Sequence, residues 1–159
     1  MNHEAYSALQ LKLLEAEQFL AIGDEAVARA LNPTYVDDVR AGRAESLPDL
    51  LSLKSMDGSR RLRLREVKFK LEERLVVKAV TQLESGLRLL RQNRSGLAPA
   101  LEIDRTEIVV VLRDRKLKSQ EKPFLGEPLG PNRFELRLRG KPCRLGEGDR
   151  SYPVTVLLL

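Results

Sequence analysis

The sequence has little of what several enzyme classes require. Its 159 residues include one cysteine, Cys143, and one histidine, His3. An internal disulfide and a thiolate zinc site are therefore excluded, and a lone histidine near the start argues against a Ser-His-Asp hydrolase or a haem protein. There is no tryptophan, and aromatic residues make up 4% of the chain. We therefore expect no base-stacking platform, and we expect any nucleic acid to be held through its phosphates.

Long apolar runs are also missing. No stretch is long enough to span a bilayer, and no basic stretch followed by an apolar core marks a secretory signal. These absences predict a cytoplasmic protein with no membrane partner. A glycine-rich phosphate loop is missing too, because the segment 126–130 (GEPLG) lacks the lysine and the helix start of a nucleotide site. We expect no nucleotide cofactor.

The chain does carry enough apolar residues for one folded domain. Hydrophobic residues make up 42% and charged residues 32% of the sequence, which is typical of a globular protein of this size. The formal net charge is +5 and the pI is about 9.6, which suits a polyanionic partner such as DNA. The alternative is a pure protein-interaction module, in which this excess of positive charge would have no role.

Apolar periodicity predicts an α/β protein. Helical spacing indicates helices over 3–22, 25–31 and 75–92, the second with Asp24 as its N-cap. Alternation or continuous apolar runs indicate strands over 48–54, 61–70, 107–112, 134–139 and 154–159. Residues 35–39 are a further strand candidate, and 93–100 are a loop. The last strand suits either the core or a dimer interface. This order predicts a mixed central sheet flanked by helices, with a strand–helix–strand crossover.

The dipeptide Asp57-Gly58 favours a tight two-residue hairpin turn. With these residues at the turn, the numbers of cross-strand partners sum to 115. Asp49 then faces Glu66, on the side of the hairpin that also carries Lys68 and four leucines. The opposite side carries arginines that we expect to be solvated: Arg61, Arg63 and Arg65.

Two carboxylates that face each other repel unless something offsets the repulsion. A divalent cation is the natural candidate, because Mg²⁺ takes one or two carboxylates and keeps several waters for a substrate phosphate. Lys68 on the same side suits a role in holding a water or in stabilising negative charge on a phosphate. The simpler alternative is that Asp49 caps the strand entry and Glu66 pairs with Lys68 or an arginine.

The order Pro48-Asp49, hairpin, Glu66-Val67-Lys68, helix and buried strand resembles the PD-(D/E)xK nuclease superfamily, also called restriction-endonuclease-like. The segment 48–70 is most similar in pattern to Holliday-junction resolvases and to Mrr-like and RecB-like nucleases. The resemblance covers about residues 4–112 of a single domain over 1–159, and it leaves 113–159 as a C-terminal strand extension. Because its motif is short, the resemblance depends mainly on the order of helices and strands.

The resemblance implies a restriction-endonuclease-like core and a Mg²⁺-dependent deoxyribonuclease, with Mn²⁺ as a substitute metal. Asp49 and Glu66 match the metal-binding acids, and the Val67 carbonyl matches a backbone ligand. Lys68 matches the lysine that orients the nucleophilic water, and Gln82 matches a polar residue that some branches place near the site. Many members add a glutamate from the first helix, and the candidates are Glu15, Glu17 and, favoured by the resemblance, Glu25.

The resemblance also implies partners. DNA is the expected substrate, in recombination, repair or defence, and a homodimer or larger protein assembly is expected. A basic stretch with Lys116, Lys118 and Lys122 suits either phosphate contacts or a solvated connection. The family's strand between the first helix and the aspartate strand has only a doubtful counterpart here. An alternative is therefore a catalytically inactive nuclease-like subunit that binds DNA or assembles with a larger complex.

Overall fold

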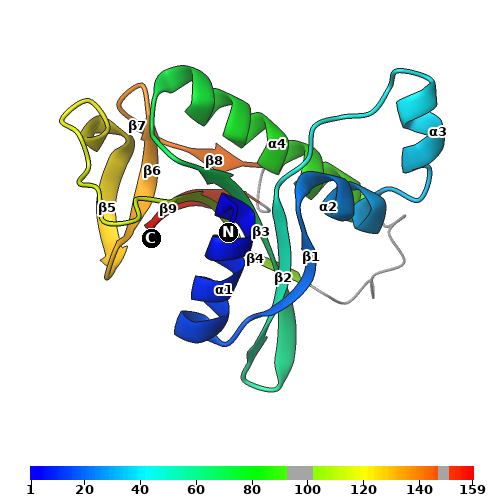
Figure 1. Cartoon of the computed structure of the whole chain (residues 1–159), viewed down its shortest axis with the longest axis horizontal. Coiled ribbons are helices and arrows are strands. Elements are labelled where there is room, and N and C mark those ends of the chain that lie inside the picture. Colours follow the sequence, from blue (N-terminus) through cyan, green and yellow to red (C-terminus); the bar gives the residue numbers. More distant parts are fainter. Residues whose placement is uncertain (93–101, 147–150) are drawn as a thin grey trace.

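The structure of the chain, a computed structural model, describes residues 1–92, 102–146 and 151–159. These residues form an α/β protein with a mixed, open sheet of nine strands and four α-helices (Figure 1). The helices are α1 (His3–Glu15), α2 (Asp24–Leu31), α3 (Tyr35–Arg40) and α4 (Glu73–Arg91), with a 3₁₀ turn over Lys122–Phe124. The strands are β1 (Gln18–Ile22), β2 (Leu50–Met56), β3 (Ser59–Lys68), β4 (Glu102–Val110), β5 (Leu125–Gly130), β6 (Arg133–Leu138), β7 (Lys141–Pro142), β8 (Arg144–Leu145) and β9 (Tyr152–Leu158).

The sheet has the order β1-β2-β3-β4-β9-β6-β5, with β7 beside β6 and β8 beside β9. The β3–β4 and β4–β9 pairs are parallel, and the other pairs are antiparallel. Helix α4 connects β3 to its parallel neighbour β4, so the predicted crossover and mixed sheet are confirmed. Strand β9 lies inside the sheet, which identifies the last apolar run as a core strand.

The central hairpin has the predicted register. Leu53 pairs with Leu62 and Leu51 pairs with Leu64, as the sum of 115 requires. Both turn residues have positive φ, 47° at Asp57 and 82° at Gly58, the signature of the type I′ turn that matches the twist of a two-stranded ribbon.

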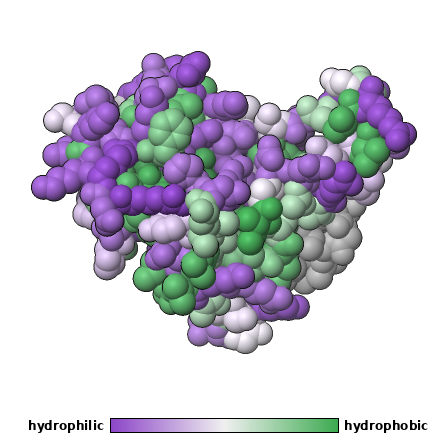
Figure 2. Space-filling view, viewed as in Figure 1, coloured by the Kyte–Doolittle hydropathy of each residue, from purple (hydrophilic) through white to green (hydrophobic). Residues whose placement is uncertain are grey.

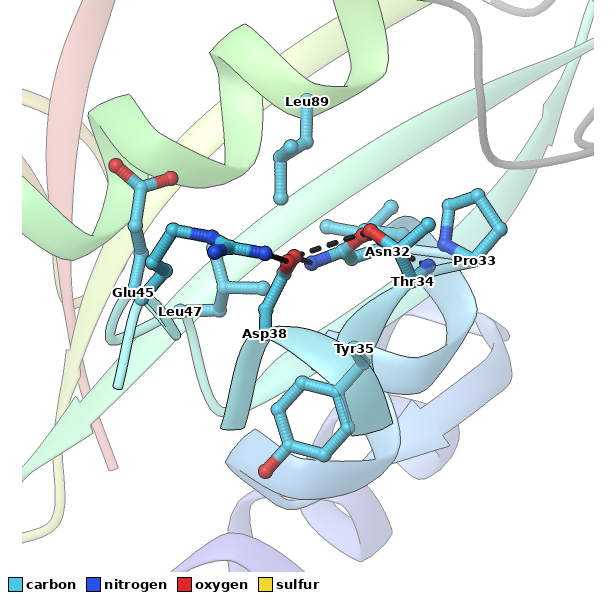
Figure 3. A pocket seen from close by; sticks show the side chains of 10 residues that line it. Asn32, Pro33, Thr34, Tyr35, Asp38, Glu45, Leu47 and Leu89 are labelled. Atoms are coloured by element: carbon cyan, nitrogen blue, oxygen red, sulfur yellow. Dashed lines mark hydrogen bonds and ion pairs between the residues drawn. The ribbon is translucent and has the colours of Figure 1, made fainter. Parts of the chain in front are cut away.

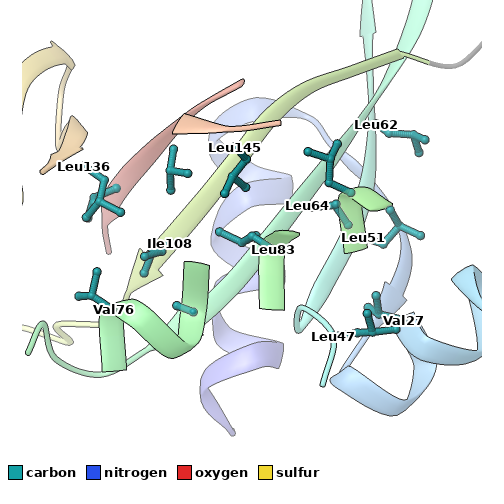
Figure 4. Packing of buried hydrophobic residues seen from close by; sticks show 14 of the residues in the cluster. Val27, Leu47, Leu51, Leu62, Leu64, Val76, Leu83, Ile108, Leu136 and Leu145 are labelled. Carbon is teal, nitrogen blue, oxygen red and sulfur yellow. The ribbon is translucent and has the colours of Figure 1, made fainter. Parts of the chain in front are cut away.

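The sheet is covered on both faces. Helices α2 and α4 pack against one face in a large apolar cluster that includes Val27, Leu64 and Leu83 (Figure 4). Helix α1 covers the other face through Ala8 and Leu11. Neighbouring β4 residues alternate between the two clusters, which confirms that its apolar run is buried on both sides.

Several predicted elements are wrong. The helix predicted over 3–22 ends at Glu15, where Ala16 adopts a left-handed conformation, and Gln18–Ile22 instead pairs with β2. The segment 35–39 lies in helix α3. Gly23, and not Asp24, is the N-cap of α2. The predicted loop over 93–100 lies outside the described residues. Among the described helices, none has the length and apolar character needed to cross a membrane.

Candidate active site

The hairpin brings Asp49 and Glu66 together at the end of β3. The backbone N–H of Val67 donates a hydrogen bond of 2.9 Å to Asp49 Oδ2, and the Lys68 ammonium lies 3.0 Å from Glu66 Oε2. Both acids are buried, with exposed fractions of 8% for Asp49 and 2% for Glu66. Glu66 Oε1 is buried and has no hydrogen-bond partner in the part of the chain that the structure describes. The acid pair is thus desolvated, and this oxygen has no donor among the described residues other than a proton that the pair itself holds.

The surroundings oppose ionisation of both acids at once. Burial raises the pKa of Glu66 to about 8, and the Asp49 carboxylate adds to the rise while Lys68 opposes it. Burial also raises the pKa of Asp49, against the hydrogen bonds from Glu66 and from the Val67 N–H. Without a cation, the pair therefore shares a proton at neutral pH, as coupled buried carboxylates do. A bound cation would allow both acids to ionise.

The segment that leads into Asp49 is fixed by its backbone. The N–H of Gly23 donates to the Asp49 carbonyl at 2.7 Å, and Gln82 Nε2 donates to the Leu47 carbonyl at 3.3 Å. Helix α4 approaches closely at Gly86, where a Cβ would lie 3.0 Å from Pro48 Cδ. Gln82 is itself buried and leaves its Oε1 without a partner among the described residues. Gln82 therefore contacts the backbone of the segment that leads into Asp49.

The start of α1 bears a charge that affects the acid pair. The Glu4 carboxylate raises the pKa of Asp49, and sequence reasoning missed this residue. A signal existed, because Glu4, Ala8 and Leu11 share one helical face and the last two are buried against the sheet. The helical spacing that predicts the helix over 3–22 follows a different set, Leu9, Leu13, Ala16 and Leu20, of which Leu13 is 73% exposed.

The structure does not bring Glu25 to the acid pair through any contact among the described residues. Glu25 is exposed at the start of α2, and its carboxylate pairs with Arg29 at 3.0 Å one turn later. A carboxylate at this position is favoured by the helix dipole, which is the simpler alternative to a site role. The other two candidate glutamates, Glu15 and Glu17, lie on the opposite face of the sheet.

That opposite face carries a buried ionic network, so the expectation of solvated arginines is wrong for Arg63 and Arg65. Arg65 is 0% exposed and binds both Glu17, at 2.5 Å, and Glu107, at 3.0 Å. Arg63 binds Glu15 at 2.9 Å. Burial opposes the ionisation of Glu17 and Glu107, but the Arg65 guanidinium and hydrogen bonds outweigh it and lower the pKa of each to about 2. The network joins the α1–β1 connection to β3 and β4.

A pocket of about 240 Å³ is lined by residues that include Leu47, and neither acid of the pair lines it. Figure 3 shows its lining, in which Asn32 Nδ2 donates to Asp38 at 2.8 Å. Leu47 lines the pocket and accepts the Gln82 hydrogen bond. The pocket residues therefore adjoin the segment that carries Asp49.

The donor set limits which metal fits. In the described ranges, no three or more His, Cys, Asp or Glu side chains are grouped to hold an ion. Two carboxylates with one uncommitted oxygen suit Mg²⁺ or Mn²⁺, which retain water ligands, and do not suit a structural zinc site. Comparison of the chain with protein-family models, curated proteins and solved structures finds no match.

Proposed function

We propose that the protein is a Mg²⁺-dependent deoxyribonuclease with a restriction-endonuclease-like core. One observation carries the proposal: two buried carboxylates face each other, one oxygen of Glu66 has no partner among the described residues, and Lys68 lies 3.0 Å from the other. Such a pair is unfavourable unless a cation or a proton offsets the charge. A protein that needed only stability would gain from an apolar pair here.

Asp49, Glu66 and the Val67 carbonyl would hold Mg²⁺ or Mn²⁺. When bound, the ion would lower the pKa of a water and neutralise charge on the scissile phosphate. Lys68 supplies a fixed positive charge beside the same pair, suited to orienting that water or to stabilising the negative charge that develops on the phosphate. Asp49 is kept in position by the Val67 N–H.

The order of elements supports the same proposal. Strand β1 fills the place between the first helix and the aspartate strand, for which the sequence offered only a doubtful candidate. Glu4, at the start of α1, raises the pKa of Asp49, whereas Glu25 makes no contact with the acid pair among the described residues. Gln82 supports the aspartate segment through the Leu47 carbonyl.

Partners follow from the surface. DNA is the proposed substrate, consistent with the net charge of +5. We also propose self-association or a larger assembly. Figure 2 shows apolar side chains gathered over α1, where Leu13 and Leu14 are exposed, and surface of this kind often marks a contact with another protein.

A second candidate is an inactive DNA-binding or assembly subunit. It is favoured by the depth of the acid pair and by the engagement of Lys68 with Glu66. Calorimetric titration with Mn²⁺ separates the two candidates. The nuclease predicts binding heat that Glu66→Gln removes, and the inactive subunit predicts none.

Cleavage assays test the nuclease directly. Duplex, branched and single-stranded DNA are incubated with the protein in Mg²⁺, in Mn²⁺ and in EDTA. We expect metal-dependent cleavage that falls at least about 100-fold in Asp49→Asn and Lys68→Ala. Lys78→Ala, an exposed lysine of α4, is the matched control and should cut normally. Unchanged cleavage in Lys68→Ala would refute the mechanism.

A further inference from the structure

The segment that follows β4 carries an excess of positive charge. Residues 113–122, which we call the basic loop, contain five arginines and lysines and two acids, so their formal charge is +3 in a chain of +5. Lys116, Lys118 and Lys122 are exposed, and none of the three has an ion-pair partner among the described residues. From the sequence, this stretch suits either phosphate contacts or a solvated connection.

Glu121 gives the basic loop a fixed shape. Its carboxylate accepts hydrogen bonds from the Arg115 guanidinium, at 2.8 and 2.9 Å, and from the backbone N–H of Lys118, at 2.8 Å. Glu121 is 2% exposed, and a buried carboxylate is costly without such partners. The lysines therefore extend from an ordered backbone, which lowers the entropy cost of binding a ligand.

The basic loop begins beside the acid pair. Strands β3 and β4 are parallel, and Lys68 is the register partner of Val110, the last residue of β4. The next residue, Val111, donates its N–H to the Lys68 carbonyl at 2.9 Å. The ammonium of the same lysine lies 3.0 Å from Glu66 Oε2. The acid pair and the loop thus share the edge formed by the carboxyl ends of parallel strands, where open α/β sheets bind their ligands.

Two further hydrogen bonds hold the basic loop against the residues after Lys68. Arg115 donates to the Phe69 carbonyl at 2.5 Å, and the Leu71 N–H donates to Glu121 Oε1 at 3.0 Å. The ion pair that closes the loop is therefore also the pair that binds it to the end of β3. Because these contacts are part of the fold, the position of the loop relative to the acid pair is fixed.

We propose that Lys116, Lys118 and Lys122 bind backbone phosphates that flank the phosphate at the acid pair. The inference rests on the proposed function and names its substrate class: a polynucleotide that extends beyond the cleaved bond, and not a small phosphodiester. Lysine binds a phosphate as a point charge and does not read the bases. Three lysines without ion-pair partners among the described residues can make such contacts without breaking others. The low aromatic content leads to the same expectation, that nucleic acid is held through its phosphates.

Binding in EDTA tests the basic loop without requiring cleavage. Fluorescence anisotropy measures the affinity for a labelled duplex of about 20 base pairs over a range of salt concentrations. Each phosphate contact contributes about 0.9 to the slope of log affinity against log salt. The triple variant Lys116→Gln, Lys118→Gln, Lys122→Gln should therefore lower the slope by about 2 to 3 and weaken binding at least about tenfold at 0.1 M salt. Each single variant should lower the slope by about 0.9.

A matched control removes the same charge from other parts of the surface. The control triple variant carries three substitutions of exposed cations on α3, the hairpin and β7: Arg40→Gln, Arg60→Gln and Lys141→Gln. We expect it to lower the slope by less than about 1. In Mg²⁺, only the triple variant of the basic loop should raise the KM for cleavage, by about the factor that it loses in binding. All the substituted side chains are exposed, so both triple variants should melt at the wild-type temperature.

The outcomes separate this inference from the nuclease. Equal losses for the two triple variants, no loss for either, or an unchanged KM would overturn the role of the basic loop, while Lys68-dependent cleavage still supported the nuclease. Loop-dependent DNA binding without metal-dependent cleavage would support phosphate binding by the loop and refute the nuclease. Vesicles of phosphatidylcholine and phosphatidylserine supply another anionic surface. Loop-dependent binding to these vesicles, with DNA affinity independent of the loop, would overturn the proposal in favour of a membrane surface.

Discussion

Glu66→Gln should make the metal-free protein more stable at neutral pH, because it removes a carboxylate whose ionisation the fold opposes. Burial and Asp49 raise the pKa of Glu66 from 4.5 to about 8. Between these values the native state keeps a proton that the unfolded chain has released, so the unfolding free energy of the wild type falls as pH rises. At pH 7, about 2.5 pH units above the ordinary pKa of 4.5, the raised pKa lowers the unfolding free energy of the wild type by roughly 3 kcal/mol.

The variant also changes the contact with Lys68, whose ammonium lies 3.0 Å from Glu66 Oε2, and this offsets part of the gain. We therefore expect Glu66→Gln to raise the unfolding free energy by about 2 kcal/mol at pH 7, and by little at pH 4.5. Urea unfolding in EDTA at pH 4.5, 6, 7 and 8 measures the difference. Glu73→Gln, an exposed carboxylate paired with Arg139, should show no such trend.

Magnesium should narrow the difference in unfolding free energy between Glu66→Gln and the wild type. A cation that binds the native wild type raises its unfolding free energy by mass action, and Glu66→Gln should lose that gain. A variant that is less stable than the wild type at pH 8 in EDTA, or a difference that does not change with pH, would refute the proton-sharing pair.

Three further substitutions test the surrounding structure. Arg65→Met leaves Glu17 and Glu107 buried without their main partner, so urea unfolding at pH 7 should show a loss of about 3–5 kcal/mol, whereas the exposed Arg60→Met should lose little. Gly86→Ala should lower the melting temperature and the metal-dependent cleavage rate together, because the new Cβ would lie 3.0 Å from Pro48; overpacking costs about 1–3 kcal/mol, more than the gain in helix propensity. Gly58→Ala should cost about 1–2 kcal/mol in thermal unfolding, since φ there is 82°, with cleavage unchanged.

The hairpin and its acid pair could be predicted because local rules determine them. Asp57-Gly58 favours one turn type, and a period of two then assigns every side chain of both strands to a face. The same rules placed Arg63 and Arg65 together on the other face. They could not show what covers that face, because Glu15 and Glu17 come from a segment 46 to 50 positions earlier.

The errors near the start of the chain have a different cause. Residues 18–22 fit both the helical spacing of the preceding segment and a short alternating strand, and pairing with β2 decides in favour of the strand. The apolar spacing through Leu9 and Leu13 marks a different side of α1 from the buried side, which carries Glu4. Glu25 is favoured by the family resemblance, yet its exposed position beside Arg29 depends on how α2 packs.

The position of β9 has a consequence for folding kinetics. It pairs with β4 on one side and β6 on the other, and Thr106 must find Val154, 48 positions later. Closing so long a loop is slow, whereas a two-residue hairpin forms in about 1–10 μs. We therefore expect β2 and β3 to join early and β9 to dock late, so that Asp49 and Glu66 become neighbours in a folding intermediate whose sheet is still divided.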